Sequence, residues 1–597
     1  MDKPQSTRRR KARRRVMVLL VLCCAVFALF LARLAWLQFT MADHYAQKMA
    51  EASSASYTLP QHAARGSITD RSGTVLAQDE TVYDVYLRVP APPGTNLRET
   101  VNTIAALTGG KDVETQLAAF CSAVSAGELP VTQGLDSIGA ATYYRAGLVQ
   151  SGAVRLAARG VRRWPDGTIL PHTLGFTGPV TAEQWPAARA QGLAMDATIG
   201  QNGLEAAYDT LLRGRDGQLQ INVGLDGVTR ETMQTSTPVP GCTLVLTLDA
   251  DLQKTLQTAL QNQMDTLRTT KGIGAGREVR AGAAVVVDVR TGGILAAASL
   301  PDFDLSRYRS DYAALCADSA APLLDRVCQG LYAPGSAFKP AVAAAALTAG
   351  IDPAATVNCT GKYFYYSNYH PGCLQYGHRG PVDLRTALEY SCNIFFYDTG
   401  RRLGVDTFSA MARQLGLAND TGVEITAAQG RLTWSTDTNY QDGLTLMAAI
   451  GQGNTAVTPL QLAQYAATLA NYGRKPTLHF ADRAVQPATG AAVWQYEPAF
   501  TEIPGGEAVF GPIRDGMKRM AQTARALREA PVTVAAKTGS PQLADTLPGG
   551  SHYVNSVLIG YAPADDPQIA MAVVLEYGGG GANAAPVMRA VLDAWFE

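Results

Sequence analysis

The sequence has no excess of either charge, because its 597 residues contain 51 lysines and arginines and 51 aspartates and glutamates. The two signs are nevertheless unevenly placed, since eight basic residues and one acidic residue crowd the first fifteen positions. Without these nine, 43 basic and 50 acidic residues remain. Nucleic-acid binding requires a basic face, so this mildly acidic body argues against a nucleic-acid partner.

Long apolar runs are also missing, with one exception at Val16 to Phe39. Its first 17 residues carry no charge, and Arg33 and Trp36 suit the far membrane interface. A cleaved signal peptide is the alternative, but it would have a shorter apolar core and a better small-x-small site than "ARLAWLQF". We therefore expect an uncleaved single-pass anchor at residues 16–38. The positive-inside rule predicts a cytoplasmic tail at 1–15, with the rest of the chain outside the cell membrane.

Several motifs of other enzyme classes are absent as well. The sequence has no G-x-S-x-G nucleophile elbow and no H-E-x-x-H zinc helix. "GIGAGR" lacks the strand–loop–helix context of a dinucleotide site, and "GGGGANAAP" lacks the lysine of a P-loop. These absences exclude the commonest hydrolase and nucleotide-binding signatures.

The length and texture of the chain predict more than one domain. Residues 39–235 are expected to form a mixed strand-and-loop region without a catalytic constellation, and a spacer or interaction module is the favoured interpretation. Its predicted elements are two strands within Arg65–Val89 joined by a turn at Asp70–Gly73, and helices near Asn96–Leu107, Glu114–Val124 and Gly203–Gly214.

Residues 236–597 show a different pattern. "TLVLTLDADLQKTLQTALQNQMDTL" predicts a strand and an amphipathic helix, and "AGAAVVVDVRTGGILAAASLP" predicts a hairpin that turns at Arg290–Gly293. A second hairpin and a final helix follow near the C-terminus. Hairpins at both ends with helical sequence between them predict an α/β (α+β) domain, in which helices flank an antiparallel sheet.

The stretch "YAPGSAFKP" contains an S-x-x-K pair, Ser336 and Lys339. One helical turn apart, the two side chains share a face, so the amine can reach the hydroxyl. Serine is a weak nucleophile until a base removes its proton, and lysine can be that base only when burial or a nearby cation lowers its pKa. Taken alone the pair is weak, since a serine after Pro-Gly is usually a helix cap.

Two further triplets strengthen the signal. "EYSCNIFF" supplies Ser391 and Asn393, and "VAAKTGSPQ" supplies Lys537, Thr538, Gly539 and Ser540. Lys537 ends an apolar run and is expected on a strand. Gly539 would let a substrate backbone lie close to that strand. The three motifs occur in order within one predicted domain.

In these motifs the sequence resembles the penicillin-binding and serine β-lactamase superfamily. Beyond them, "RGSITDRSG", "RRWPDG", "GLEAAYDTLLRG" and "GQGNTAVTPLQ" resemble a class B penicillin-binding protein with an N-terminal pedestal domain. The resemblance covers nearly the whole chain. It implies a membrane-anchored peptidoglycan D,D-transpeptidase that needs no cofactor for catalysis, is acylated by penicillin, and works with a membrane-embedded glycan polymerase. This chain has K-T-G-S where many relatives have K-T-G-T.

The resemblance also implies residue roles. Ser336 would attack the penultimate D-alanine carbonyl of a stem peptide, and Lys339 would be its base. Ser391 would relay a proton to the departing D-alanine, and Asn393 would hold the site together. Lys537 would keep Lys339 neutral by repulsion and, with Thr538 and Ser540, bind the substrate carboxylate. Backbone N–H groups of Ser336 and Ser540 would form the oxyanion hole.

Three cysteines near these motifs leave two alternatives open. A disulfide between Cys359 and Cys373 is the simple expectation for an external protein. The other is a zinc site of Cys359, Cys373, His378 and Cys392, since the pair His378 and Cys392 resembles zinc ligands of some class members.

Three rival functions remain at this stage. A β-lactamase or penicillin-sensing receptor would share the motifs, but the first needs no large pedestal and the second needs more membrane spans. A D,D-carboxypeptidase differs only in using water as the acceptor. A non-catalytic cell-wall scaffold is disfavoured because all motif residues are intact.

Overall fold

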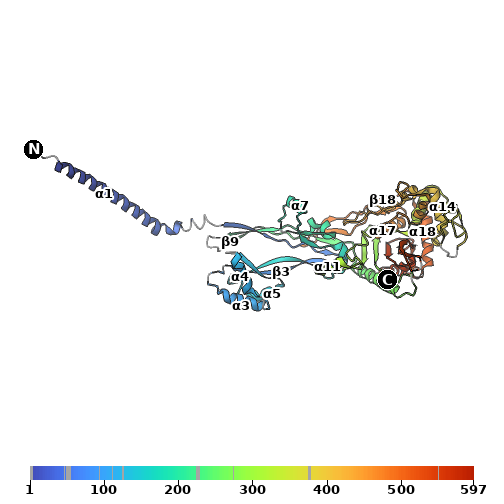
Figure 1. The fold of residues 1–597 in the computed structure, drawn as a ribbon, viewed down its shortest axis with the longest axis horizontal. Coiled ribbons are helices and arrows are strands. Elements are labelled where there is room, and N and C mark those ends of the chain that lie inside the picture. The colour runs from blue at the N-terminus through green and yellow to red at the C-terminus, as the bar shows by residue number, and fades with distance from the viewer. Residues whose placement is uncertain are drawn as a thin grey trace. The chain divides into compact units, whose positions relative to one another are not determined.

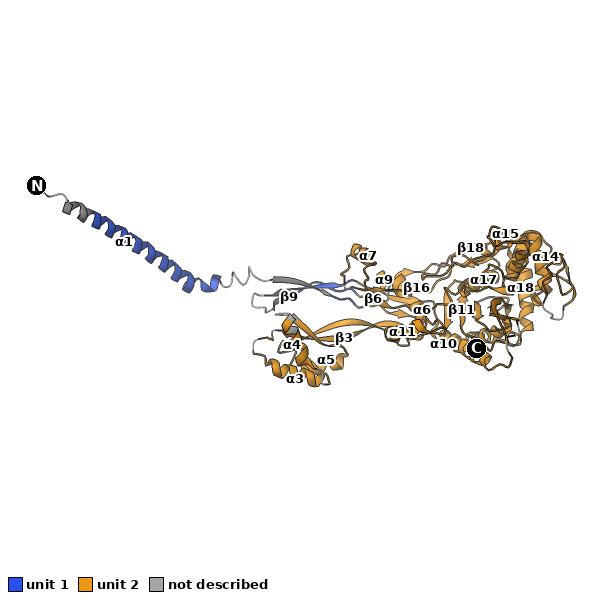
Figure 2. Cartoon of the chain, in the orientation of Figure 1, with its two compact units in different colours: residues 1–63, 215–239 blue, residues 64–214, 240–597 orange. Residues whose placement is uncertain are grey.

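The computed structural model describes residues 5–597 except 46–47, 49–54, 90, 93, 110–111, 124–126, 196, 224–228, 273, 374–377 and 549. These residues form two compact units, shown in different colours in Figure 2. The first comprises residues 1–63 and 215–239, and the second comprises residues 64–214 and 240–597.

The first unit contains a long helix and a small sheet. Helix α1 (Gln5–Ala35) continues into a π-helical turn at Trp36–Thr40, and Figure 1 draws it as one unbroken helix. Residues 12–40 are long and apolar enough to cross a membrane, and the described residues contain no second helix of this kind. The sheet is antiparallel, with the order β1 (Ala55–Gln61), β8 (Gly217–Val223) and β9 (Thr229–Ser236).

A five-stranded antiparallel sheet forms the centre of the second unit. Its order is β12-β11-β23-β22-β19, so the strands of two hairpins lie side by side although they are almost 300 residues apart. This arrangement confirms the predicted hairpins, the first of which turns at residues 290–293. The strands are β11 (Gly282–Asp288), β12 (Ile294–Leu300), β19 (Ala535–Gly539), β22 (Ser556–Ala562) and β23 (Ile569–Leu575).

Helices cover both faces of this sheet, as the sequence pattern predicts. On β11, Ala283, Val285 and Val287 belong to one hydrophobic cluster, and Ala284 and Val286 belong to another, because successive residues of a strand point to opposite faces. The first cluster includes α12 (Lys339–Thr348) and α17 (Pro459–Ala470). The second includes α10 (Ala250–Arg268) and α20 (Ala585–Phe596).

A second, seven-stranded sheet also belongs to this unit. Its order is β17-β16-β10-β2-β3-β4, with β5 paired to β3, and β2 runs parallel to β10. Strands from the predicted pedestal and from the chain after residue 240 therefore share one sheet. They are β2 (Ile68–Thr69), β3 (Val75–Val89), β4 (Gly127–Leu135), β5 (Val154–Arg163), β10 (Thr243–Leu246), β16 (Ala481–Val485) and β17 (Ala492–Gln495).

The pedestal helices follow the sequence prediction with one correction. Helices α3 (Leu97–Leu107) and α4 (Val113–Ala123) lie where expected. The single helix predicted at Gly203–Gly214 is wrong, since the chain forms α8 (Gly203–Ala207) and α9 (Asp209–Leu212). Tyr208 separates them with φ −110° and ψ 20°, and its hydroxyl donates to Glu424 Oε1 at 3.0 Å. A tertiary hydrogen bond thus accompanies the interruption of local helical periodicity.

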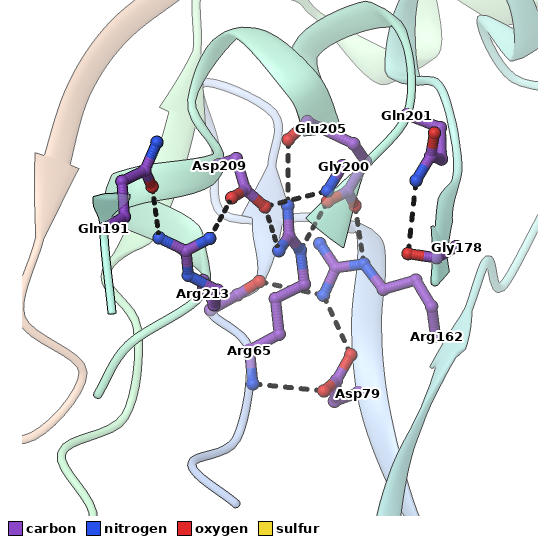
Figure 3. A network of polar contacts seen from close by, with 11 residues as sticks. Arg65, Asp79, Arg162, Gly178, Gln191, Gly200, Gln201, Glu205, Asp209 and Arg213 are labelled. Carbon is purple, nitrogen blue, oxygen red and sulfur yellow. Dashed lines mark hydrogen bonds and ion pairs between the residues drawn. The ribbon is translucent and has the colours of Figure 1, made fainter. Parts of the chain in front are cut away.

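A buried ionic network ties α8 and α9 to β5 and to the chain before β2 (Figure 3). Glu205 is fully buried, and its two carboxylate oxygens accept from Arg65 Nε and Arg162 Nε, each at 2.6 Å. Arg65 also donates to Asp209 at 2.7 Å, and Arg162 to Asp79 at 3.3 Å. Burial alone would lower the pKa of Arg65, but Glu205 and Asp209 raise it above its usual value.

The remaining helices of eight residues or more complete the second unit. They are α5 (Ser137–Arg145), α11 (Tyr308–Ala317), α14 (Asn393–Leu403), α15 (Val405–Gln414), α16 (Asp442–Ala449) and α18 (Gly506–Thr523).

Candidate active site

Ser336 lies in a tight turn that leads directly into α12. Residues Gly335–Phe338 form a 3₁₀ helix, and α12 begins at Lys339 with Phe338 as its N-cap residue. Ser336 is therefore not the cap of α12. Its side chain remains partly exposed, whereas Lys339, one turn later, is fully buried.

The Lys339 amine reaches the second motif. Its Nζ donates to the Ser391 carbonyl oxygen at 2.7 Å, to Ser391 Oγ at 3.1 Å and to Asn393 Oδ1 at 2.7 Å. Burial lowers the pKa of Lys339 to about 7, because a charged amine loses its hydration inside the protein. A substantial fraction of this amine is neutral at physiological pH, and a neutral amine can accept a proton.

Lys537 approaches the same hydroxyl from the edge strand of the sheet. It lies on β19, is fully buried, and donates to Ser391 Oγ at 3.0 Å and to the Thr538 carbonyl oxygen at 3.2 Å. Burial and, second, repulsion by Lys339 lower the pKa of Lys537 well below its usual value. The structure thus brings Lys339, Ser391, Asn393 and Lys537 together from three separate elements.

Ser391 adopts a backbone conformation that residues other than glycine rarely take. Its φ is +57°, in the left-handed region, and it lies between α13 (Leu384–Glu389) and the start of α14. Strained residues of this kind persist where the surrounding structure holds them, and they cluster at functional sites. Here the conformation coincides with a side chain that meets two lysines.

Gly539 is required by the packing of the protein itself. A Cβ at this position would lie 2.1 Å from the Pro334 carbonyl oxygen and 3.3 Å from Ala337 N, so β19 passes directly against the Ser336 turn. From the sequence we expected Gly539 to make room for a substrate backbone. In the structure it makes room for the backbone of Pro334. The close approach places the third motif beside the first.

Thr538 and Ser540 lie at the end of β19 on either side of Gly539. Ser540 is exposed, and its Oγ accepts a hydrogen bond from Gly581 N at 2.8 Å. Ser540 N lies near the turn as well, since a Cβ on Gly335 would be 3.1 Å from it.

Gly451, the first residue of "GQGNTAVTPLQ", has a structural role that the sequence did not reveal. Its carbonyl oxygen accepts from Gly335 N at 2.9 Å, and a Cβ at Gly451 would meet the Gly335 carbonyl oxygen at 2.2 Å. The segment "GQGN" therefore packs against the turn that carries Ser336, through the contact between Gly451 and Gly335. Gly451 lies between Ile450 and Gln452, and this local sequence gave no sign of its contact with Gly335.

A cluster of soft ligands adjoins the second motif. Cys359, Cys373, His378 and Cys392 are all buried, and their ligand atoms lie within 4.8 Å of one another. Cys373 and Cys392 sulfurs are 3.9 Å apart, and Asn393 N donates to Cys373 Sγ at 3.3 Å. The hydrogen bond between the Cys373 and Cys392 sulfurs and hydrogen bonds from backbone N–H groups lower the pKa of Cys373, against the opposite effect of burial.

The alternative expectation of a Cys359–Cys373 disulfide does not match this geometry, because both residues are free thiols. Three sulfurs and one imidazole nitrogen form the donor set that tetrahedral Zn²⁺ prefers. The donors therefore fit a structural zinc ion.

Comparisons with known proteins identify the family to which the chain belongs. The family model of the penicillin-binding protein transpeptidase domain matches residues 282–593, and that of the penicillin-binding protein dimerisation domain matches residues 60–246. The peptidoglycan D,D-transpeptidase MrdA of Acinetobacter baumannii is 28% identical over 592 residues, covering 94% of this chain and 84% of the relative. The MrdA of Escherichia coli K12 is 26% identical, covering 90% of this chain and 87% of the relative.

Solved structures show the same fold. A chain from a peptidoglycan synthase complex that coordinates polymerization and crosslinking has a TM-score of 0.74 and 29% identity, with 98% of both chains covered. Penicillin-binding protein 2 of Helicobacter pylori, in complex with MreC, has a TM-score of 0.75 and 23% identity over 91% of this chain and 99% of that one.

Proposed function

Because the chain belongs to the penicillin-binding transpeptidase family and is a class B peptidoglycan D,D-transpeptidase, we propose that Ser336 is its acylated nucleophile and Lys339 the base. One observation carries this assignment. The buried amine of Lys339, one turn after Ser336, has a pKa of about 7. It contacts the hydroxyl of Ser391, which the buried amine of Lys537 also contacts.

In the proposed acylation, Ser336 Oγ bonds to the penultimate D-alanine carbonyl carbon as Lys339 takes its proton. The oxyanion would accept from the backbone N–H groups of Ser336 and Ser540. The bond to the terminal D-alanine nitrogen then breaks, and the proton passes from Lys339 through Ser391 Oγ to that nitrogen. The amine of a neighbouring stem then attacks the ester carbonyl carbon, the bond to Ser336 Oγ breaks, and the proton lost by the amine returns to Ser336 Oγ.

Lys537, Thr538 and Ser540 are proposed to bind the substrate carboxylate. Their positions on and just after β19 support this role, as does the cost of burying an ammonium group without an anion. Asn393 holds Lys339 through its Oδ1 and is proposed as a positioning residue. Burial is the main cause of the low pKa of Lys339, and Lys537 would add repulsion whenever it is charged.

A structural zinc ion held by Cys359, Cys373, His378 and Cys392 is part of the proposal. The buried, closely spaced donors support it. Such an ion supplies no chemistry to the acyl transfer. It would hold together the protein segments that carry its four ligands, including Cys392. Since Cys392 lies between Ser391 and Asn393, these ligands would fix the second motif.

Residues 16–38 are proposed to anchor the protein in the cell membrane, with residues 1–15 in the cytoplasm. The apolar helix at residues 12–40 and the basic tail before it support this orientation.

We further propose a pedestal at 39–235, a catalytic region at 236–597, peptidoglycan stem peptides as substrates, β-lactams as inhibitors and a membrane glycan polymerase as partner. The similarity to a peptidoglycan synthase complex supports the last of these.

Labelling of the detergent-solubilised full chain with fluorescent penicillin tests the nucleophile. Wild type should take up stable label, and Ser336→Ala should take up none. Equal labelling of the two proteins would refute the assignment, and rapid loss of label would indicate a β-lactamase. Release of D-alanine without cross-linked product would instead indicate a carboxypeptidase.

A further inference from the structure

Beside the second motif, residues 361–373 fold back on themselves in what we name the aromatic hairpin. Lys362 pairs with Gly372 in an antiparallel bridge, Tyr363 N donates to the Pro371 carbonyl oxygen at 3.0 Å, and Cys373 N donates to the Gly361 carbonyl oxygen at 2.9 Å. Within these thirteen residues lie Tyr363, Phe364, Tyr365, Tyr366, Tyr369 and His370. Catalysis as proposed above uses none of these six side chains.

The base of the hairpin is attached to the active site. Asn393 Nδ2 donates to the Gly372 carbonyl oxygen at 3.2 Å, while Oδ1 of the same side chain accepts from Lys339. Tyr363 is buried, and its hydroxyl donates to Asp398 on α14 at 3.0 Å. The hairpin therefore packs against α14, the helix that begins at Asn393.

The rings near the tip are exposed and nevertheless fixed. Phe364 is 63% exposed and Tyr365 is 58% exposed. The Arg401 guanidinium carbon lies 3.9 Å from the centre of the Tyr365 ring, and the Phe364 and His370 ring centres are 4.9 Å apart. Side chains held in this way lose little further freedom when a ligand binds to their open surfaces.

We propose that the aromatic hairpin binds the glycan strand, a polymer of N-acetylated amino sugars, to which the donor stem peptide is attached. The inference rests on the proposed function, because that function brings a stem peptide with its sugars to Ser336. Aromatic rings pack against the apolar C–H faces of pyranoses, as they do against other apolar surfaces. Ser367 and Asn368, exposed at the tip, offer hydroxyl and amide groups to the sugar hydroxyls and N-acetyl groups.

Two features favour a glycan over a protein partner. Exposed polar side chains, Lys362 on one side and Ser367 and Asn368 on the other, flank the aromatic run, which therefore lacks the continuous apolar core of a protein interface. The base of the hairpin also contacts Asn393, which holds Lys339, so an occupant of the hairpin must coexist with bound substrate.

Binding of peptide-free glycan strands to the detergent-solubilised full chain tests this proposal. Strands of alternating N-acetylated sugars, stripped of stem peptides by an amidase, serve as the probe in calorimetry. Wild type should bind them, and the double variant Phe364→Ala, Tyr365→Ala should bind about tenfold more weakly or not at all. Tyr365→Phe should retain binding, because it keeps the ring.

Penicillin acylation measured on the same samples separates this inference from the proposed function. The double variant should acylate within about twofold of wild type, which shows that the Asn393 contact is intact. Tyr144→Ala, which removes a 50%-exposed ring on α5, is the matched control and should change neither property. Acylation by wild type without glycan binding, or glycan binding unchanged in the double variant, overturns the hairpin proposal alone. Failure of wild type to acylate overturns the proposed function.

Discussion

Lys339 and Lys537 place their amines on one hydroxyl, Ser391 Oγ, at 3.1 and 3.0 Å, and both side chains are fully buried. Two ammonium groups so close together inside a protein are unfavourable, because neither burial nor the like charge is compensated by an anion among these contacts. The pair therefore favours a state in which at least one amine is neutral. A serine hydroxyl can accept from one amine and donate to the other, which suits a proton relay.

The rate of acylation by penicillin should rise with pH through about 7 and level off above it. Below that pH the Lys339 amine is protonated and cannot take the Ser336 proton, whereas above it the neutral base predominates. Stopped-flow measurement of the second-order acylation rate constant between pH 5 and 9 checks this. A rate constant that keeps rising up to pH 9 without levelling off, as for an ordinary lysine with a pKa of about 10, would contradict a buried base.

Replacing Gly539 with alanine should disrupt the site without touching a catalytic group. The new Cβ would lie 2.1 Å from the Pro334 carbonyl oxygen, so β19 must move away from the Ser336 turn. A displacement of about 1 Å costs on the order of a hundredfold in rate, and we expect that loss in penicillin acylation.

Gly580→Ala is the control for this variant. Gly580 has a φ of −62°, and a Cβ there would meet nothing within 4 Å. Its acylation rate should stay within about twofold of wild type. Equal rates for Gly539→Ala and wild type would show that the strand and the turn are not in rigid contact.

The sequence predicted the fold class and the strands and helices around the site because these depend on local periodicity. The two apolar runs at Gly282–Asp288 and Ile294–Leu300, separated by a turn, and the apolar face of Ala250–Arg268 are properties of short windows. The break at Tyr208 was not predictable, since it coincides with a hydrogen bond to Glu424, 216 residues away.

The motif residues could be named from sequence, but their contacts could not. Nothing in "GQGN" indicated that Gly451 supports the turn before Ser336, because that contact joins residues more than 100 positions apart. The cysteines left a disulfide and a metal site open, as spacing alone does not give sulfur–sulfur distances. Likewise the sequence around Arg65 and Arg162 gave no sign of their shared partner, Glu205.

Glu205→Gln should destabilise the protein strongly. The variant would leave Arg65 and Arg162 buried with one carboxylate fewer, and breaking a buried ion pair costs about 3–5 kcal/mol. Glu80→Gln, which removes an exposed partner of Arg163, should change stability by no more than about 0.5 kcal/mol. Urea unfolding of both variants gives the comparison. A Glu205→Gln protein as stable as wild type would mean that the network contributes little net free energy.

Removing the metal should weaken both stability and acylation if the four soft ligands hold zinc. Full chain purified without chelator should contain about one zinc ion, and all nine cysteines should react with a thiol reagent after denaturation in chelator. Dialysis of the folded protein against chelator should then lower the melting temperature and slow acylation, because Cys392 lies between Ser391 and Asn393. Cys316→Ser, at an exposed position outside the cluster, should leave metal content and acylation unchanged. Metal-free protein with two unreactive cysteines would instead show that a disulfide, and not a metal ion, links the cysteines beside the active site.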